Sequence, residues 1–253
     1  MKIGLLQYSP VWENKKDNKK KIINLLNQNK TKIDLLILPE MTLTGFSMKS
    51  KQLAEGIEGA SFSFFKELAQ TKQINIITGI IFSEGKSIFN TSVLIDKNGE
   101  VKSIYKKIHP FTFSTEDKNY SAGIKTKIAE CGNWKIGLSV CYDLRFPELY
   151  RFYAKQKVEL LTVIANWPVD RIEHWRHLLK ARAIENQCYV AGVNRVGDTG
   201  KLKYNGYSSV FDPMGNELLS VENEEGIFTT EIKLEKVNKL RNELPFLDDI
   251  RLI

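Results

Sequence analysis

Short apolar runs alternate with amphipathic segments along this chain, and this alternation constrains its fold more than any other feature of the sequence. Residues 34–39 read Asp-Leu-Leu-Ile-Leu-Pro, and residues 158–165 form a second, mostly apolar run. Such runs are typical of strands that are buried on both faces of a sheet. The pattern predicts strands at residues 3–8, 34–39, 74–82, 89–96, 101–108, 134–140, 158–165, 189–194, 208–211, 217–221 and 227–232. It predicts helices in the lysine-rich segment 15–26 and at residues 62–69, 148–156 and 174–187.

Hairpin signals interrupt this alternation. Asn98 and Gly99 lie between two apolar runs, and an Asn-Gly pair in that setting is a strong signal for a tight β-hairpin. The chain reads as two halves rich in strand–helix units, each of which closes with a hairpin. We therefore expect an α/β fold in which two mixed β-sheets pack together with helices on the outside. No linker rich in Ser, Gly or Pro separates the halves, so residues 1–253 are predicted to form a single domain.

The composition excludes several classes of protein. With 37 Lys and Arg against 30 Asp and Glu the formal net charge is +7, but the lysines lie on one helix face or are scattered, and no nucleic-acid-binding motif is present. No apolar run approaches the ~18–20 residues of a membrane span, and the N-terminus lacks the pattern of a signal peptide. Three cysteines in 253 residues exclude a disulfide scaffold. We expect a cytoplasmic protein that binds neither nucleic acid nor membranes.

Cys141 occupies the most informative position in the sequence. The strand predicted at residues 134–140 ends there, and Pro147 opens a helix within a few residues. A sharp strand-to-helix turn is where α/β hydrolases place their nucleophile, and backbone N–H groups at such a turn can hold an oxyanion. A cysteine packed in the core fits the same local sequence equally well. Cys131 and Cys188 have no comparable setting and are predicted to be core or incidental thiols.

A catalytic cysteine needs a base and an electrostatic partner, and two candidates lie at predicted strand ends. Glu40 directly follows the buried strand that ends at Pro39, and Lys107 lies where the second strand of the hairpin ends. Taken singly, each is more simply explained as a solvated surface residue. Their combination with Cys141 carries the weight, because α/β enzymes gather reacting groups at strand ends.

The histidines give weaker signals. His109 precedes Pro110 at the end of a predicted strand, so a Cys–His pair is an alternative that lacks further support. His174 and His177 lie one turn apart on a polar helix face. Two such ligands without a third partner make a weak metal signal, so we expect solvated or capping histidines and no metal site.

Together these segments resemble the nitrilase superfamily of carbon–nitrogen hydrolases, and the resemblance covers nearly the whole chain. It rests on the words Leu38-Pro39-Glu40-Met41 with Thr44-Gly45-Phe46, Tyr105-Lys106-Lys107-Ile108-His109, and Cys141-Tyr-Asp-Leu-Arg-Phe-Pro-Glu148. The resemblance implies a four-layer αββα sandwich and a catalytic triad of Glu40, Lys107 and Cys141. It also implies that Glu116 is a second active-site glutamate that positions water or substrate. It further implies a homodimer that requires no metal or organic cofactor.

Within the superfamily, the word Ala165-Asn166-Trp167-Pro168 and the segment 181–190 look most like the omega-amidases. These enzymes hydrolyse the terminal amide of short ω-monoamides of dicarboxylic acids. The resemblance makes 2-oxoglutaramate and 2-oxosuccinamate the expected substrates. The alternatives are another amidase of the superfamily, acting on deaminated glutathione or on N-carbamoyl compounds, and a non-catalytic binding protein of the same fold.

Five further residues are candidates for binding this small-molecule amide. Arg145 is four residues after Cys141, and a guanidinium suits a substrate carboxylate, although an ion pair with Glu148 explains it equally well. Trp167 follows a predicted strand and is expected either to wall the pocket or to lie in the core. The backbone N–H of Tyr142 is placed to stabilise the oxyanion. The other two candidates are Asn166 and Phe113.

Overall fold

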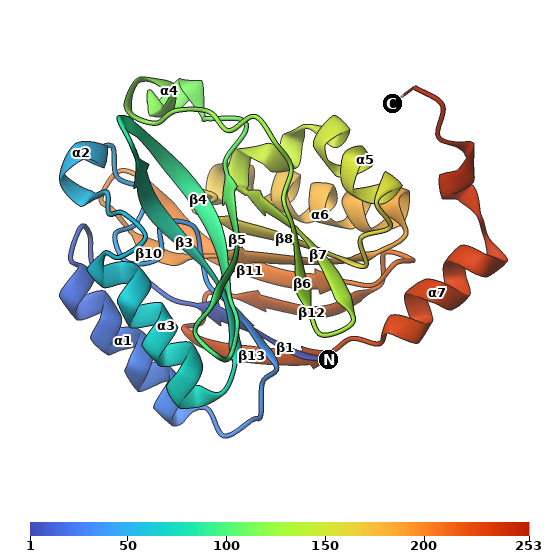
Figure 1. Cartoon of the computed structure of the whole chain (residues 1–253), viewed down its shortest axis with the longest axis horizontal. Helices are drawn as coiled ribbons and strands as arrows, with labels where there is room; N and C mark the ends of the chain where they lie inside the picture. Colours follow the sequence, from blue (N-terminus) through green and yellow to red (C-terminus); the bar gives the residue numbers. More distant parts are fainter. Residues whose placement is uncertain (253) are drawn as a thin grey trace.

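The computed structural model describes residues 1–252 and contains two β-sheets that lie face to face (Figure 1). In spatial order, the first sheet consists of β13 (Gly226–Glu231), β1 (Lys2–Gln7), β2 (Leu35–Ile37), β3 (Asn75–Glu84), β4 (Ser87–Ile95) and β5 (Val101–Lys106). The second consists of β10 (Val196–Asp198), β11 (Lys203–Phe211), β9 (Tyr189–Asn194), β8 (Leu160–Ala165), β7 (Trp134–Val140) and β6 (Ile128–Cys131), and β12 (Glu217–Glu222) pairs with β11. Both sheets mix parallel and antiparallel pairs, as the sequence predicted.

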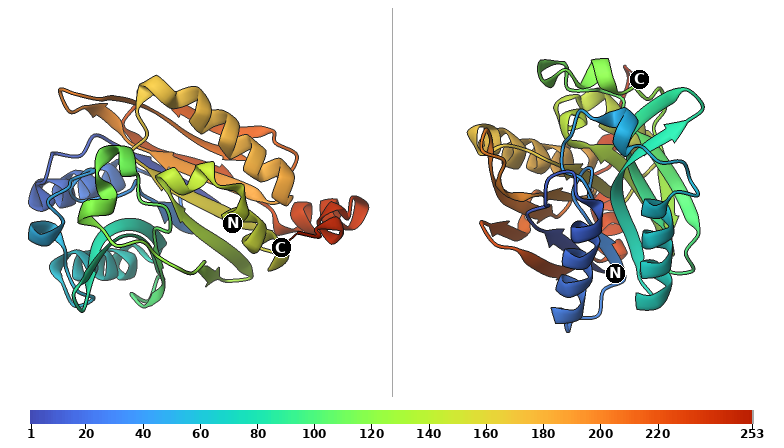
Figure 2. Two further views of the ribbon diagram at one scale, coloured as in Figure 1. Left: turned by 90° about the horizontal axis from the view of Figure 1, so that it is seen from above. Right: turned by 90° about the vertical axis from the view of Figure 1, so that its left-hand side faces the viewer.

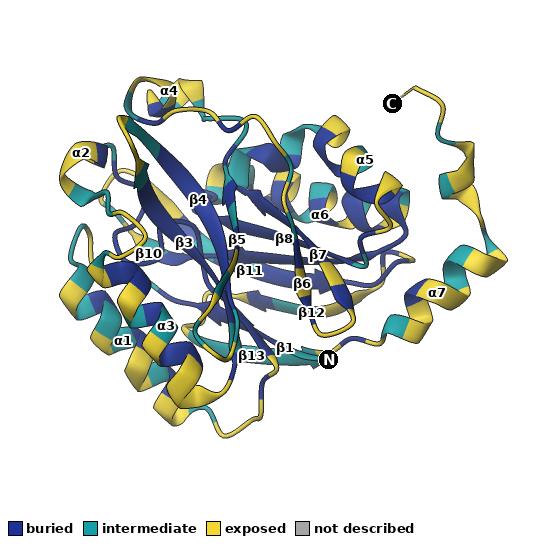
Figure 3. Ribbon diagram, viewed as in Figure 1, coloured by how far each residue is buried: buried dark blue, intermediate teal, exposed yellow. Residues whose placement is uncertain are grey.

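The short strand β2 shows why the sheets are buried on both sides. Leu35 and Ile37 point into the core between the two sheets, whereas Leu36 points to the opposite face of the first sheet. Successive side chains of a strand point to opposite faces, so an uninterrupted apolar run satisfies two apolar layers at once. Figure 3 shows the resulting burial of the strands.

Helices cover the outer face of each sheet (Figure 2). Helices α1 (Lys15–Gln28) and α3 (Ala60–Lys72) bury Ile22, Phe62 and Phe65 against the first sheet. Helices α5 (Pro147–Lys155) and α6 (Ile172–Asn186) bury Tyr153 and Trp175 against the second. The layers therefore run helix, sheet, sheet, helix, and the predicted αββα sandwich is confirmed.

The last strand joins the two halves of the chain. β13 leaves the second half and pairs antiparallel with β1, with Lys2 opposite Glu231 and Gln7 opposite Gly226. Its apolar pattern correctly indicated a strand, but a pattern of burial does not identify the strand's partner. The sequence also gave no signal for the short strands β6 and β10 or for helices α2 (Ser50–Leu53), α4 (Glu116–Asn119) and α7 (Leu234–Glu243).

Helix α7 leads away from the sandwich and carries the chain toward its C-terminus outside the body of the molecule (Figure 1). Within residues 1–252, no helix is both long and apolar enough to cross a membrane.

Candidate active site

Glu40 follows β2 at the carboxyl end of that strand and is 1 % exposed. Pro39 ends the run before it, because proline has no N–H to donate to a neighbouring strand. Lys107 Nζ lies 3.1 Å from Glu40 Oε1, and the backbone N–H of Asn166 donates to Glu40 Oε2 at 2.9 Å. The Asn166 side chain also donates to the Glu40 backbone oxygen at 2.8 Å. These donors hold the buried carboxylate in one orientation.

Lys107 follows β5, and its backbone N–H donates to the backbone oxygen of Asn90 on β4 at 2.9 Å. Its ammonium lies 2.8 Å from Glu116 Oε2 and 3.1 Å from Glu40 Oε1. Burial alone would lower the pKa of Lys107, but the charges of Glu116 and Glu40 outweigh it, so the pKa is raised. Lys107 is therefore a fixed buried cation.

Glu116 begins α4 and is fully buried behind Lys107. Both of its oxygens are occupied, by Lys107, by the Asn90 amide at 2.8 Å and by the Phe111 backbone N–H at 2.6 Å. It does not line the cavity described below. The structure thus places Glu116 in contact with Lys107 and away from the cavity lining, and its role in positioning water or substrate stays a prediction.

Cys141 lies at the end of β7, where the chain enters the 3₁₀ helix η2 (Cys141–Arg145). Its φ of 48° is in the left-handed region that side chains other than glycine rarely adopt. Asp143 holds this turn, because its carboxylate accepts the Val140 N–H at 3.0 Å and the Tyr105 hydroxyl at 2.8 Å. The predicted sharp strand-to-helix turn is thus present.

The electrostatic environment of Cys141 favours a protonated thiol. Burial raises the pKa of the Cys141 thiol well above 9.0, the negative charge of Glu40 raises it further, and Lys107 opposes this rise. A thiol of this kind needs a base to remove its proton before it can act as a nucleophile. Glu40 is the carboxylate that lines the same cavity as Cys141 among the described residues, and its charge acts on this thiol.

Asn90 is a member of this cluster that the sequence reasoning missed. It lies on β4, is 1 % exposed, and donates through Nδ2 to Glu40 at 2.6 Å and to Glu116 at 2.8 Å. The signal in the sequence was a run of polar residues, Asn90, Thr91 and Ser92, between the apolar residues of this strand. Asn90 therefore links the two carboxylates that flank Lys107.

A cavity of about 110 Å³ opens in front of Cys141. The lining includes the charged residues Glu40 and Lys107 together with Cys141, and most of the other lining residues are aromatic or apolar. The lining residues are Glu40, Phe46, Lys107, Phe111, Ser114, Cys141, Tyr142, Arg145, Asn166, Trp167, Pro168, Arg171, Leu202 and Tyr204. The structure thus brings seven of the nine predicted site residues to one cavity, and the two that do not line it are Glu116 and Phe113.

The structure places Phe113 away from the cavity lining. This side chain is 87 % exposed and lies in the 3₁₀ turn η1 (Thr112–Ser114). Phe111 lines the cavity instead, because its backbone N–H is tied to Glu116, and the turn that follows directs Phe113 outward. Two aromatic residues so close in sequence could not be told apart by pattern alone.

Arg145 and Trp167 pack together at the cavity. The guanidinium of Arg145 lies 4.9 Å from the centre of the Trp167 ring, and its Nη2 lies 3.1 Å from His174 Nδ1. Within the described residues Arg145 forms no salt bridge with Glu148, so the ion-pair alternative does not fit this geometry. Trp167 is 3 % exposed, and it both packs in the core and lines the cavity.

The histidines lie apart from the cavity lining. His109 Nδ1 is 2.8 Å from Asp143 Oδ1, and its ring stacks on Phe146 with centroids 3.8 Å apart. His177 is exposed and bonds to the backbone oxygen of Glu173 at 2.7 Å. Among residues 1–252, no three His, Cys, Asp or Glu side chains converge in a way that could hold a metal ion.

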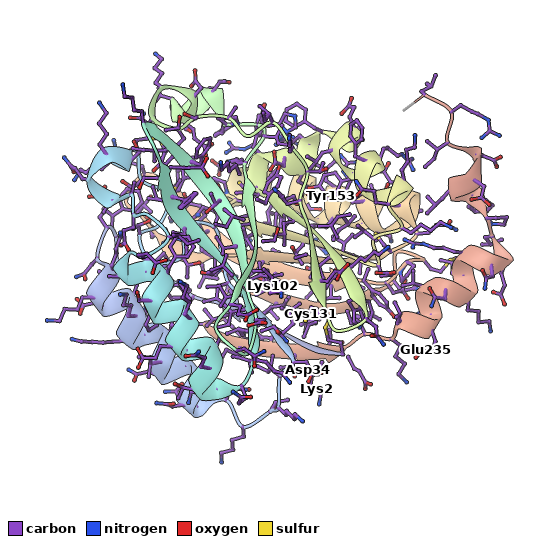
Figure 4. The ribbon with its side chains drawn as sticks, viewed as in Figure 1. Lys2, Asp34, Lys102, Cys131, Tyr153 and Glu235 are labelled. Atoms are coloured by element: carbon purple, nitrogen blue, oxygen red, sulfur yellow. The ribbon has the colours of Figure 1, made fainter. Side chains whose placement is uncertain are left out.

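The other two cysteines lie elsewhere. Cys131 lines a separate groove with Asp34 and Lys102 (Figure 4), and burial raises its pKa to about 11. Cys188 is 1 % exposed, and burial raises its pKa to about 12. Neither thiol is beside a buried base and cation of the kind that Cys141 has, in agreement with their prediction as core thiols.

The family model described as carbon-nitrogen hydrolase matches residues 2–242, a range that contains the whole cavity. The 2-oxoglutaramate amidase of Bacillus subtilis (strain 168) is 33 % identical over 251 residues, which cover 98 % of this chain and 97 % of that protein. Omega-amidase YafV of Escherichia coli (strain K12) is 34 % identical over 259 residues, covering 98 % and 96 %. XC1258 from Xanthomonas campestris, a CN-hydrolase superfamily protein solved with an arsenic adduct in its active site, has a TM-score of 0.95 at 33 % identity, covering 100 % of this chain and 98 % of that one.

Proposed function

The chain belongs to the carbon–nitrogen hydrolase family, and from this premise we propose that it is an omega-amidase, which releases ammonia from the terminal amide of short dicarboxylic-acid monoamides such as 2-oxoglutaramate and 2-oxosuccinamate. The observation that carries the proposal is the convergence of Glu40, Lys107 and Cys141 at one cavity that Arg145 also lines. Relatives named 2-oxoglutaramate amidase and omega-amidase support the same substrate class.

In the proposed reaction, Glu40 takes the proton of the Cys141 thiol while the sulfur attacks the amide carbon of the substrate. The raised pKa of this thiol means that Glu40 must act within the attack step, since little thiolate exists beforehand near neutral pH. When the tetrahedral intermediate collapses, Glu40 returns the proton to the leaving nitrogen. Ammonia departs, and the acyl group remains on Cys141 as a thioester.

Preorganised donors stabilise the oxyanion of that intermediate. Lys107 is held at the cavity by Glu40 and Glu116, so its ammonium needs no rearrangement. The N–H of Tyr142 lies in the first turn of η2, where backbone N–H groups have no partner within the helix. Loss of one oxyanion donor typically raises the barrier by about 2.7–4 kcal/mol.

Water completes the cycle. Glu40 removes a proton from a water molecule that attacks the thioester, and it gives this proton to the departing sulfur. The acid product then leaves, and the Cys141 thiol and the Glu40 carboxylate are regenerated. Glu116 keeps Lys107 in place during both halves of the reaction, as its contacts with that ammonium at 2.8 and 3.1 Å support.

Arg145 supplies the proposed specificity for a substrate carboxylate. A carboxylate bound to this guanidinium would hold a short acyl chain with its terminal amide at Cys141. Binding at the remote end then contributes to the rate at the reacting end, because the amide is held in position for attack.

Ammonia release from a substrate panel tests the proposal. The panel contains 2-oxoglutaramate, the neutral amide pentanamide, an N-carbamoyl amino acid and deaminated glutathione, with the Cys141→Ala protein as the control for non-enzymatic release. We expect the highest kcat/KM for 2-oxoglutaramate. A higher value for the N-carbamoyl compound or for deaminated glutathione would reassign the substrate, and no release from any of them would favour a binding protein.

We also propose that the single catalytic domain forms a homodimer in the cytoplasm. Phe152 on α5 and Ile184 on α6 are 51 % and 47 % exposed on the outer helical layer, which supports a contact there. The three free cysteines fit a reducing compartment. Light scattering should give twice the chain mass of 29.0 kDa, and cell fractionation should place the protein in the soluble cytoplasmic fraction.

A further inference from the structure

We infer that Arg171 is a second specificity-determining residue, which together with Arg145 selects substrates whose far end is an anion and rejects those that carry an ammonium beside the carboxylate. This inference rests on the proposed omega-amidase function and names the group that such a substrate presents away from its amide.

The charges around the cavity are strongly unequal. Among the described residues that line it, the cations are Lys107, Arg145 and Arg171, and the one carboxylate is Glu40. Glu40 is already bonded to Lys107 at 3.1 Å and to the backbone N–H of Asn166 at 2.9 Å. The lining therefore has no carboxylate left to receive a cationic substrate group.

Neither Arg145 nor Arg171 forms a salt bridge with an acidic residue of the described chain. The salt bridges that arginines form in residues 1–252 involve Arg151, Arg176, Arg182 and Arg251. Arg145 meets His174 and the face of Trp167 instead, and the guanidinium of Arg171 lies 5.8 Å from the centre of the Phe111 ring. Two guanidiniums without a counterion at one small cavity are a binding arrangement for a carboxylate.

Arg171 is held beside Arg145 by its backbone and not by its side chain. Its backbone oxygen accepts the indole N–H of Trp167 at 2.8 Å, and its backbone N–H donates to Pro168 at 3.2 Å. The guanidinium of Arg145 also lies over the ring of Trp167. Replacing the Arg171 side chain therefore leaves the turn and the tryptophan in place while removing one cation.

This arrangement predicts how the cavity treats amino acids. L-Asparagine has the same carbon chain, carboxylate and terminal amide as 2-oxosuccinamate, but it carries an ammonium where the oxo group stands. That ammonium would lie near the cations of the cavity, and no free carboxylate of the lining would pair with it. Repulsion between like charges would then weaken the binding of L-asparagine relative to 2-oxosuccinamate. The enzyme would thereby spare free amino-acid amides.

A matched series of four-carbon amides tests the inference on the purified enzyme. Succinamate has a carboxylate where butanamide has a methyl group. L-Asparagine has the structure of succinamate with an added ammonium group. The kcat/KM values are compared among the wild type, Arg171→Gln, Arg171→Lys and the control Arg176→Gln. Arg176 pairs with Glu173 at 3.1 Å and does not line the cavity, so the control removes an equal charge nearby.

We expect Arg171→Gln to reduce the succinamate-to-butanamide ratio of kcat/KM by about 10- to 100-fold, the effect of one charged hydrogen bond. We also expect Arg171→Gln to reduce the difference in kcat/KM between succinamate and L-asparagine. Arg171→Lys should retain part of the succinamate-to-butanamide ratio, and Arg176→Gln should leave this ratio unchanged. Equal losses on succinamate and butanamide in Arg171→Gln would show a structural role and overturn the inference while leaving the amidase standing. If the wild type hydrolysed none of these amides, both the inference and the proposed function would fall.

Discussion

Asn90 offers the sharpest test of how the buried charges are held. Its amide donates to Glu40 and to Glu116, and so it joins two carboxylates that flank one lysine. Replacing Asn90 by alanine removes both hydrogen bonds without removing a charge. Replacing Asn90 by aspartate keeps the size of the side chain but places a third carboxyl group beside those of Glu40 and Glu116.

The magnitude for Asn90→Ala follows from its contacts. A hydrogen bond to a charged group contributes about 1.5–3 kcal/mol, so losing two costs about 3–6 kcal/mol. Asn90 Oδ1 is buried without a partner, and removing an unpaired buried acceptor returns about 1–3 kcal/mol. Both carboxylates keep Lys107 as a partner. The free energy of unfolding should therefore fall by about 2.5 kcal/mol, or about 5–10 °C in Tm for a chain of this size.

Urea unfolding and thermal melts, read together with ammonia release, provide the assay. Asn75→Ala serves as the control, because the Asn75 amide donates to a neutral backbone oxygen at 2.8 Å near the surface and should contribute less. Asn90→Asp should be less stable than Asn90→Ala near pH 7 and should recover as the pH falls, since a protonated carboxyl can again donate. An Asn90→Asp protein as stable as the wild type near pH 7 would refute the argument that the cluster is a set of charges held by donors.

The remaining predictions concern the thiols and the charged pair. Cys141→Ala should abolish ammonia release with folding retained, whereas Cys131→Ala and Cys188→Ala should keep it; intact-mass measurement should find the acyl group on Cys141. Glu40→Gln and Lys107→Met should both fail to form the thioester, and an inactive His109→Ala beside an active Glu40→Gln would replace this scheme with a Cys–His mechanism. Burial raises the pKa of Cys131 from 9.0 to about 11 and that of Cys188 from 9.0 to about 12. The unfolded chain therefore loses these protons first, and the free energy of unfolding should fall as the pH rises above about 9. Urea titrations at about pH 8 and pH 10.5 measure this fall, which should be smaller in Cys188→Ala.

The sequence was most informative where burial fixes the pattern. The run at residues 34–39 indicated a strand with both faces covered, and β2 has its side chains in two apolar layers. Glu40, Lys107 and Cys141 were found because each follows a strand, and strand ends are local features. Their meeting at one cavity depends on how the two sheets pack, and only the resemblance to a family indicated this in advance.

What the sequence did not indicate depends on contacts between distant segments. Asn90 is one of several polar residues in β4, and its importance appears only when Glu40 and Glu116 reach it from other elements. Arg171 looks like a surface arginine at a helix start until Trp167 and Phe111 surround it. Phe111 and Phe113 differ only in which way a short turn directs them.

The pairing of β1 with β13 also has a consequence for synthesis on the ribosome. β1 leaves the exit tunnel before strands β2 to β12, yet its partner strand β13 follows all of them. Until then one edge of the sheet that carries Glu40 and Lys107 has unpaired N–H and C=O groups, which can pair with other nascent chains. A ribosome-bound chain that stops before Gly226 should therefore be prone to aggregation and inactive, so amide hydrolysis begins only once β13 has left the ribosome.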